Sequence, residues 1–285
     1  GGLPPGLTVN TSTGTISGTA TTAGTYPVTV TVTDQRGTSR SVSFTWTVTA
    51  PPASPAPSAP STNLYQGGVL TDGPLGYWRL GETGGPTATD SSGNGWHGTY
   101  AGAPVFGRTG ALTGNPDTSV SLNGTNAGVS VPDRNDFIGT APFSIEAWVR
   151  PQNLGASSDY KTIVRKAGSG GGYWFWVNSI EGFGFERFSG SGTSKVTAGP
   201  STTGVWLHLV ATFDGATLRL YVNGTLRSSG GSAFPLSDTT ATVDIGIHST
   251  VPANSMNGDL DDVAIYGTAL SAARVAAHYQ KGVNG

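Results

Sequence analysis

The chain has 285 residues, of which 11% are charged, with a net charge of −2 and no cysteine. The lack of cysteine excludes disulfides, thiol catalysis and cysteine-ligated zinc, and the low positive charge argues against a nucleic-acid partner. No apolar run approaches the roughly 20 residues that a membrane-spanning helix needs. Abundant Gly, Ser and Thr beside few charges are typical of extracellular β-proteins, so we expect a secreted or cell-surface protein.

Residues 1–50 read as a β-hairpin with leading strands. The runs TYPVTVTVTD and SVSFTWTVT alternate apolar and polar residues, and DQRG (34–37) separates them as a turn. Fifty residues are too few for a complete sandwich of about 100 residues. The next segment, PPASPAPSAPS (51–61), carries five prolines and is expected to be an extended linker.

Residues 62–285 contain many short alternating runs, among them SVSLNG, FSIEAWVRP, YWFWVN and WLHLVATFDG. Such runs between turn residues predict an antiparallel sandwich or jelly roll. Asn223-Gly224 predicts a two-residue hairpin turn. The one expected helix is SAARVAAHYQKG (271–282), with Ser271 as its cap and Lys281 and Gly282 near its end. We expect this helix to cover an open end of the sandwich.

Five motifs occur in a familiar order: GYWRLGE (76–82), DSSGNGWHG (90–98), FSIEAWVRP (143–151), WLHLVATFDGATLRLYVNG (206–224) and DLDDVAIYGTALS (259–271). Together they resemble the laminin-G-like, concanavalin A-like jelly-roll domains of secreted bacterial proteins, over about residues 62–285. Residues 2–34 resemble the second half of a bacterial immunoglobulin-like, cadherin-related repeat. The expected fold class is therefore all-β: a concanavalin A-like jelly-roll sandwich with one short C-terminal helix, after a small Ig-like fragment that lacks its family's partner strands.

The fold alone does not decide between lectin and glycosidase. Glycosidases need two carboxylates on either side of the scissile bond, and those of this fold class carry a strand motif Glu-x-Asp-x-x-Glu, which is absent here. Glu146 stands alone in its strand, and Glu181 and Glu186, five residues apart, are expected on opposite faces of a straight strand. His208 is expected to be a hydrogen-bonded strand residue. We expect no enzymatic activity.

Two segments carry oxygen ligands suited to a hard cation: DSSGNG (90–95) and DLDD (259–262). Calcium takes six to eight oxygens, which neither segment supplies alone. If Leu260 faces the core of a strand without a bulge, Asp262 points inward. The resemblance implies a structural calcium ion that joins the N-terminal loop to the C-terminal strand, with the ligands Asp90, Asn94, Asp261 and Asp262. The alternative is a solvated acidic turn without metal.

The stretch GGGYWFWVN (170–178) places Tyr173, Phe175 and Val177 on one face of a strand, and Trp174 and Trp176 on the other. The resemblance assigns the first three to the core. The two tryptophans would then form an outer platform on which sugar rings stack, and the nearby groups predicted to bond sugar hydroxyls are Arg165, Asn178, Glu186 and Arg187. In the alternatives, a loop such as 151–160 or the N-terminal β unit covers both rings.

These observations favour a non-catalytic carbohydrate-binding or adhesion module of a larger secreted or surface protein. The expected partner is a polysaccharide or glycan, and the expected state is a monomer. A structural or protein-binding spacer module, whose partner would be a surface protein, is the second hypothesis. A glycoside hydrolase or lyase of the concanavalin-like class is the third.

Overall fold

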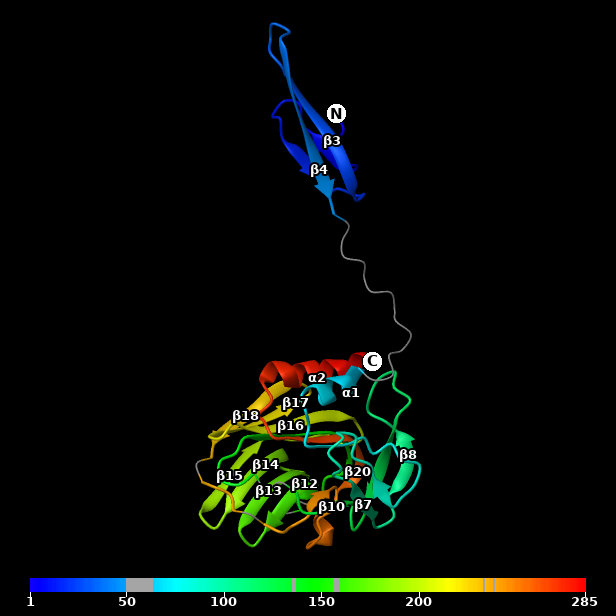
Figure 1. The fold of residues 1–285 in the computed structure, drawn as a ribbon, viewed down its shortest axis with the longest axis vertical. Coiled ribbons are helices and arrows are strands. Elements are labelled where there is room, and N and C mark those ends of the chain that lie inside the picture. The colour runs from blue at the N-terminus through cyan, green and yellow to red at the C-terminus, as the bar shows by residue number, and fades with distance from the viewer. Residues whose placement is uncertain (50–63, 135–136, 156–158, 233, 238) are drawn as a thin grey trace. The chain divides into compact units, whose positions relative to one another are not determined.

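Figure 1 shows the computed structural model, which describes residues 1–49, 64–134, 137–155, 159–232, 234–237 and 239–285. The chain divides into two compact units, Gly1–Ala59 and Pro60–Gly285. The predicted linker at residues 51–61 lies outside the described residues. Within the described residues, no helix is long and apolar enough to cross a membrane.

The first unit consists of two antiparallel pairs. Strands β1 (Leu7–Val9) and β2 (Ile16–Gly18) form one pair, and β3 (Gly24–Thr33) and β4 (Ser39–Val48) form the other. The Thr and Ser side chains of β3 and β4 share one face, where three hydroxyl pairs bond across the strands at 2.8–2.9 Å. The valines of the same strands therefore occupy the opposite face, as the alternation predicts.

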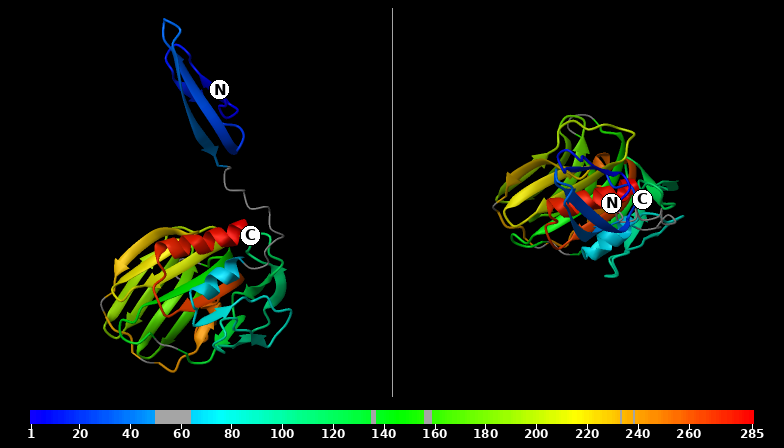
Figure 2. Two further views of the ribbon diagram at one scale, coloured as in Figure 1. Left: turned by 45° about the horizontal axis from the view of Figure 1, so that its top comes forward. Right: turned by 90° about the horizontal axis from the view of Figure 1, so that it is seen from above.

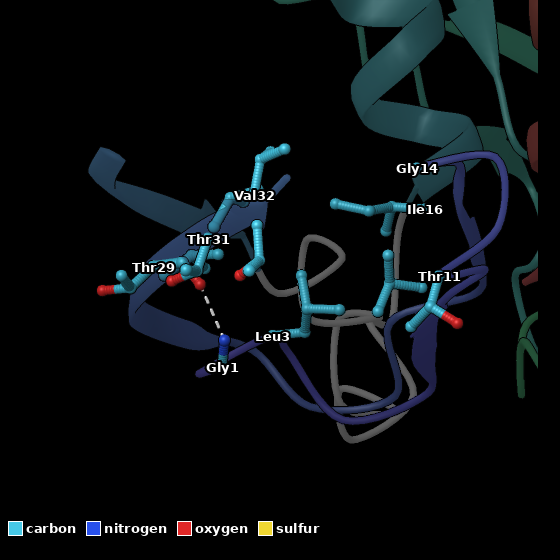
Figure 3. A pocket seen from close by; sticks show the side chains of 12 residues that line it. Gly1, Leu3, Thr11, Gly14, Ile16, Thr29, Thr31 and Val32 are labelled. Carbon is cyan, nitrogen blue, oxygen red and sulfur yellow. Dashed lines mark hydrogen bonds between the residues drawn. The ribbon is translucent and has the colours of Figure 1, made fainter. Parts of the chain in front are cut away.

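An apolar groove of about 550 Å³ lies between β3 and the β1–β2 hairpin (Figure 3). Leu3, Ile16 and Val32 line it, and the amino group of Gly1 donates to Thr29 O at its edge (2.7 Å). Of residues 1–49, only Pro4 and Val28 are buried, and Val32 is 69% exposed. Among the described residues, the unit presents one apolar side of a sandwich without a second layer.

The second unit contains two antiparallel sheets. In spatial order, the first sheet contains β15 (Gly192–Thr197), β14 (Gly182–Ser189), β13 (Gly171–Asn178), β12 (Lys161–Gly168), β19 (Val243–Ile245), β10 (Gly128–Val131), β7 (Gly98–Ala101) and β6 (Thr87–Ala88). The second contains β18 (Thr225–Gly231), β17 (Thr217–Val222), β16 (Leu207–Phe213), β11 (Phe143–Asn153), β20 (Asn257–Tyr266), β9 (Thr118–Asn123) and β8 (Val105–Thr109), and β5 (Gly76–Trp78) pairs with β20.

The inner faces of the two sheets enclose one apolar core. Tyr173, Phe175 and Val177 are at most 1% exposed and belong to it, which confirms their predicted assignment. The rings of Phe143 and Phe185 pack against them from both sheets. The predicted turn at Asn223 connects β17 and β18 with a positive φ of 51°. The predicted all-β sandwich of two antiparallel sheets is therefore confirmed.

Two helices, α1 (Leu64–Thr71) and α2 (Ala272–Asn284), lie over the outer face of the second sheet (Figures 1 and 2). Ser271 caps α2 as predicted, because its side chain accepts from Arg274 N at 3.3 Å. The sequence did not predict α1, since its two consecutive glycines reduce helical propensity. The expectation that α2 covers an open end was wrong, because α2 packs with α1 on a sheet face.

A fully buried carboxylate, Glu146 of β11, connects these helices to the sheet. Its Oε1 accepts from the hydroxyl of Tyr65 in α1 (2.9 Å) and contacts His208 Nε2 (2.6 Å), as expected of a hydrogen-bonded strand histidine. Its Oε2 accepts from the hydroxyl of Tyr266 (2.6 Å), and His278 Nδ1 of α2 lies 3.0 Å away. Both helices thus supply partners to one buried charge.

Asp72, directly after α1, extends this network. Its Oδ2 lies 3.1 Å from His278 Nε2 and 2.8 Å from Arg274 Nε. His278 therefore stands between two carboxylates. Burial lowers the pKa of His278, but Glu146 and Asp72 outweigh burial, so the pKa is raised above its usual value. Burial raises the pKa of Glu146, and the two histidines reverse this effect, so that the pKa is lowered overall.

We expect the free energy of unfolding to depend on the charge of His278. A histidine whose folded pKa is raised stabilises the fold fully below its unfolded pKa of about 6.5, and this contribution is lost as the pH rises through the folded pKa. Urea unfolding at pH 6 and pH 9 will show a decrease on the order of 1 kcal/mol in the wild type that His278→Gln lacks. Equal pH dependence in both proteins would contradict the assignment.

Candidate functional site

A row of polar and aromatic side chains crosses the outer face of the first sheet. Residues paired directly opposite each other share a face of the sheet, and the register connects one residue from each of the eight strands. We call this set the cross-strand row; in strand order it contains Lys195, Glu186, Trp174, Arg165, Asp244, Ser130, Thr99 and Thr87. The aromatic ring thus stands between an acidic and a basic neighbour.

Trp174 is partly exposed and its ring is fixed from three sides. Its Nε1 donates to Thr162 Oγ1 (3.0 Å). The rings of Tyr160 and His248 flank it, with centroids at 5.6 Å and 5.2 Å. A ring held in this way loses little conformational entropy when a ligand binds against it.

Trp176, by contrast, is completely buried. Tyr160 packs edge-on against it (4.6 Å), and Lys195 Nζ lies 5.7 Å from its ring centre. Gly184, directly opposite on β14, leaves room for the ring, since a Cβ there would lie 2.2 Å from it. The alternative in which the segment before β12 covers the rings therefore applies to Trp176 and leaves Trp174 as the accessible ring.

The two charged neighbours of Trp174 have unused hydrogen-bonding capacity. The side chains of Arg165 and Glu186 form no hydrogen bond and no ion pair within the part of the chain that the structure describes. Burial lowers the pKa of Arg165, against the opposing charges of Asp244 and Glu186. Burial raises the pKa of Glu186, with Lys195 acting against it and Glu181 with it. A free donor and a free acceptor thus flank one ring.

Asp244 and His248 continue the site and were not predicted. The buried Asp244 accepts from Thr242 Oγ1 (2.8 Å) and Ser249 N (3.1 Å). Burial lowers the pKa of His248 to about 4, so this side chain is neutral at pH 7. Its Nδ1 accepts from Val251 N (3.0 Å), which leaves the proton on Nε2. The alternation of VDIGIH could have placed Asp244 outward, whereas the position of His248 depends on a turn.

Two predicted ligand residues lie elsewhere. Asn178 is buried at the end of β13, where its Oδ1 accepts from the backbone N–H groups of Ile180 and Glu181 and stabilises a turn. Arg187 follows Glu186 directly and therefore points to the opposite face, where it is completely buried. Including both Glu186 and Arg187 in one outer site was a wrong interpretation, because adjacent strand residues alternate.

The expected separation of Glu181 and Glu186 was also wrong. Glu181 lies in the turn before β14, outside the strand to which the alternation applies. Its Oε2 is 2.5 Å from Lys195 Nζ, and its Oε1 accepts from the hydroxyl of Tyr160 (3.3 Å). Both contacts belong to the outer face. Glu181 thus shares the face of Glu186, but its two oxygens are engaged.

The predicted calcium ligands divide between two places. Trp78 of β5 pairs with Val263 on one side and with Asp90 on the other, so a strand separates the two clusters. Each carboxylate oxygen of Asp90 already accepts two hydrogen bonds, from backbone N–H groups and from Ser92 Oγ. Asn94 donates its Nδ2 to two backbone carbonyls. This arrangement does not fit a cation held jointly by all four residues.

Strand β20 has a bulge at Asp262 and Val263, and Asp261, paired with Trp148, directly precedes it. Leu260 and Val263 both face the core, and Asp262, with a φ of +48°, turns away from it and accepts from the hydroxyl of Tyr77. An inward Asp262 would require a straight strand. Asp261 Oδ1 and Asp262 Oδ2 are buried without a partner. No group of three or more His, Cys, Asp or Glu suited to a metal ion occurs among the described residues.

The fold and this outer face define a lectin-like β-sandwich. The chain belongs to the Concanavalin A-like lectin/glucanases superfamily, whose family model matches residues 123–276. The family model described as Putative Ig domain matches residues 1–49. A search of curated proteins finds no match.

Solved structures share the fold at low sequence identity. The binding domain of Paraclostridial Mosquitocidal Protein 1 is 16% identical (TM-score 0.60; 74% of this chain and 52% of that chain). Domain 4 of AbnA, a GH43 extracellular arabinanase from Geobacillus stearothermophilus, in complex with arabinotriose, is 22% identical (TM-score 0.55; 73% and 98%). The binding domain of Botulinum Neurotoxin DC in complex with SialylT is 14% identical (TM-score 0.57; 74% and 52%). The chain spans about half the length of the toxin domains.

The different surroundings of the two tryptophans predict different effects on stability. Trp176→Ala will lower the free energy of unfolding by about 3–5 kcal/mol, because it leaves a cavity beneath Tyr160. Trp174→Ala, the matched control two residues away, will cost clearly less, since the ring is partly exposed. Urea unfolding of both variants measures this difference, and a larger loss for Trp174→Ala would refute the placement of the two rings.

Proposed function

We propose that this chain is a non-catalytic carbohydrate-binding or adhesion module of a larger secreted or surface protein. The observation that carries the proposal is the arrangement at Trp174: an accessible, immobilised ring between Arg165 and Glu186, whose side chains have no partner in the described structure. A sugar ring stacked on Trp174 can accept from the guanidinium and donate to the carboxylate through neighbouring hydroxyls. The known ligand of the arabinanase domain, arabinotriose, supports a glycan as the partner class.

The charges around the ring favour a neutral glycan. Arg165 and Lys195 are balanced by the acidic side chains of Asp244, Glu181 and Glu186 in or beside the cross-strand row. With His248 neutral, the site has a small negative charge, which disfavours an anionic sugar.

The module is proposed to bind without cleaving its ligand. Glycoside hydrolysis needs two carboxylates free to act as acid and as base or nucleophile. Here Glu181 is engaged by Lys195 and Tyr160, and Asp244 accepts hydrogen bonds from Thr242 and Ser249. Among the described carboxylates of the cross-strand row, this leaves Glu186 without a partner. The combination of concanavalin A-like and Ig-like family matches supports an extracellular location. The expected test result is the absence of reducing-sugar release from any polysaccharide that the protein binds.

Trp174→Ala will abolish or weaken glycan binding by at least roughly tenfold, because the stacking surface is lost. The measurement is affinity electrophoresis and calorimetry on neutral polysaccharides, arabinan among them. Arg165→Gln and Glu186→Gln will each weaken binding severalfold through one lost hydrogen-bonding group. Trp206→Ala is the control and will bind normally, because Trp206 packs with the residues beneath the two helices on the second sheet. Wild-type protein that binds no glycan would favour the protein-binding spacer module instead.

A calcium ion at Asp261 and Asp262 is a separate proposal. The two unpartnered carboxylate oxygens support a cation at this place, and burial and the neighbouring Asp262 raise the pKa of Asp261 in its absence. Backbone carbonyls and water would complete a calcium coordination sphere. The ion would stabilise the bulge of β20 and take no part in chemistry.

Calcium will raise the midpoint of thermal unfolding over that in EDTA by roughly 5 °C, since an ion that binds only the folded state stabilises it by mass action. Asp261→Asn will remove this response. Asp90→Asn will lower the midpoint through lost hydrogen bonds but will keep the stabilisation by calcium. This result would distinguish a site at Asp261 and Asp262 from one that also includes Asp90 and Asn94. An identical midpoint in calcium and EDTA would eliminate the calcium ion.

A further inference from the structure

Arg187 carries a buried positive charge without a counter-ion. Its side chain is completely buried, and its Nη1 donates to Ser232 Oγ (2.8 Å) while Nη2 donates to Gly139 O (3.1 Å). The guanidinium carbon lies 3.8 Å from the ring centre of Phe213. Nε has no partner, and no carboxylate contacts the group within the described structure. These neutral contacts satisfy part of the hydrogen-bonding capacity of the guanidinium but do not neutralise its charge.

An unpaired buried charge is costly, because neutral dipoles replace its hydration only in part. Burial alone lowers the pKa of Arg187 to about 10, so the side chain remains protonated at neutral pH. Strand β14 therefore holds a permanent cation on the inner side of the first sheet. A negative charge near it would be stabilised in a region of low dielectric constant.

A depression of about 680 Å³ lies next to this cation at one rim of the sandwich. Four segments form it: Thr140, three residues before β11; the β14–β15 turn with the start of β15; the β16–β17 turn; and the end of β18 with the residues after it. Its polar side chains are all uncharged hydroxyls, from Thr140, Ser191, Thr193, Ser194 and Ser232. Phe234 adds an apolar surface. Among the described residues, no acidic side chain lines the depression to repel an anion.

Ser232 connects the buried cation to the depression. It lines the depression, and its Oγ accepts the Arg187 hydrogen bond, so its own hydroxyl proton remains available to donate. A hydroxyl that accepts from a guanidinium is polarised and becomes a stronger donor. Arg187 thus acts on the depression through Ser232 without being exposed to solvent.

We propose that this rim depression binds the carboxylate of an acidic sugar, with Ser232 donating to the carboxylate and Arg187 positioning and polarising Ser232. A single buried cation matches a single negative charge, the other hydroxyls suit the ring hydroxyls of a sugar, and Phe234 suits its apolar face. This site is separate from the proposed glycan site at Trp174, which lies on the outer face of the first sheet.

The test uses the full chain and three probes: glucuronate, glucose as its neutral counterpart, and acetate as a free carboxylate. Two-dimensional amide NMR will show saturable shifts at Ser191–Ser194, Gly215 and Gly231 with glucuronate. Glucose will produce none, and acetate will bind at least roughly tenfold more weakly, since it lacks the hydroxyl contacts. Equal shifts with glucose, or equal affinity for acetate, would overturn the proposal.

Variants assign the roles. Ser232→Ala will weaken glucuronate binding by about tenfold or more, the effect of one hydrogen bond to a charged group. Ser229→Ala, in β18 three residues before Ser232 and outside the depression, will leave glucuronate binding unchanged. If Ser232→Ala does not fold, Thr193→Val at the exposed rim provides the second test, with a severalfold loss of glucuronate affinity expected.

Trp174→Ala will retain glucuronate binding, so failure of the Trp174 site and failure of the rim site are distinguishable. Unchanged affinity in both rim variants would refute the site.

Discussion

A single buried carboxylate determines which surface of the sandwich is available. Glu146 lies on the outer face of the second sheet, where an unpaired charge would be prohibitively costly. Its two oxygens are satisfied by Tyr266 and His208 of the sheet and by Tyr65 and His278 of the helices. The helices must therefore dock for the charge to be tolerated, and docking closes that face. Both α-helices of the described structure are therefore engaged on the second sheet, and Trp174 stays partly exposed on the outer face of the first.

On the open face, the burial of one tryptophan supports the presentation of the other. Trp176 fills the space that Gly184 leaves and is covered by Tyr160, which also flanks Trp174. Trp174 is further held through its Nε1 by Thr162. The stacking surface is thus pre-organised by packing and by one hydrogen bond, which is the condition under which a ligand contact yields affinity rather than ordering cost.

The sequence allowed the sandwich, the core face of β13 and the hairpin at Asn223 to be predicted, because each depends on local alternation or turn chemistry. What it did not allow depends on tertiary contacts. Tyr160, directly before β12, packs on Trp176 of the paired strand β13, and α1 forms despite two glycines because it packs against α2. The bulge at Asp262 reverses a direction inferred from a straight strand. Arg187 is different, because strand alternation alone places it on the opposite face of the sheet from Glu186. Its position on the inner face could therefore have been predicted from the sequence.

The polar groups that the fold leaves without partners explain where ligands are expected. Folded proteins satisfy nearly all buried polar groups, so exceptions call for a cause. Around Glu146 both carboxylate oxygens accept hydrogen bonds, and Nδ1 of His208 is buried without a partner in the described structure. Three other places have polar groups without a partner in the described structure. A neutral sugar could bind Arg165 and Glu186 beside the accessible ring, and a cation could bind Asp261 and Asp262 at the bulge. A carboxylate could bind in the hydroxyl-lined depression next to Arg187. The charge and hydrogen-bonding capacity of these unpartnered groups, more than the shared fold, determine which class of ligand each place is expected to bind.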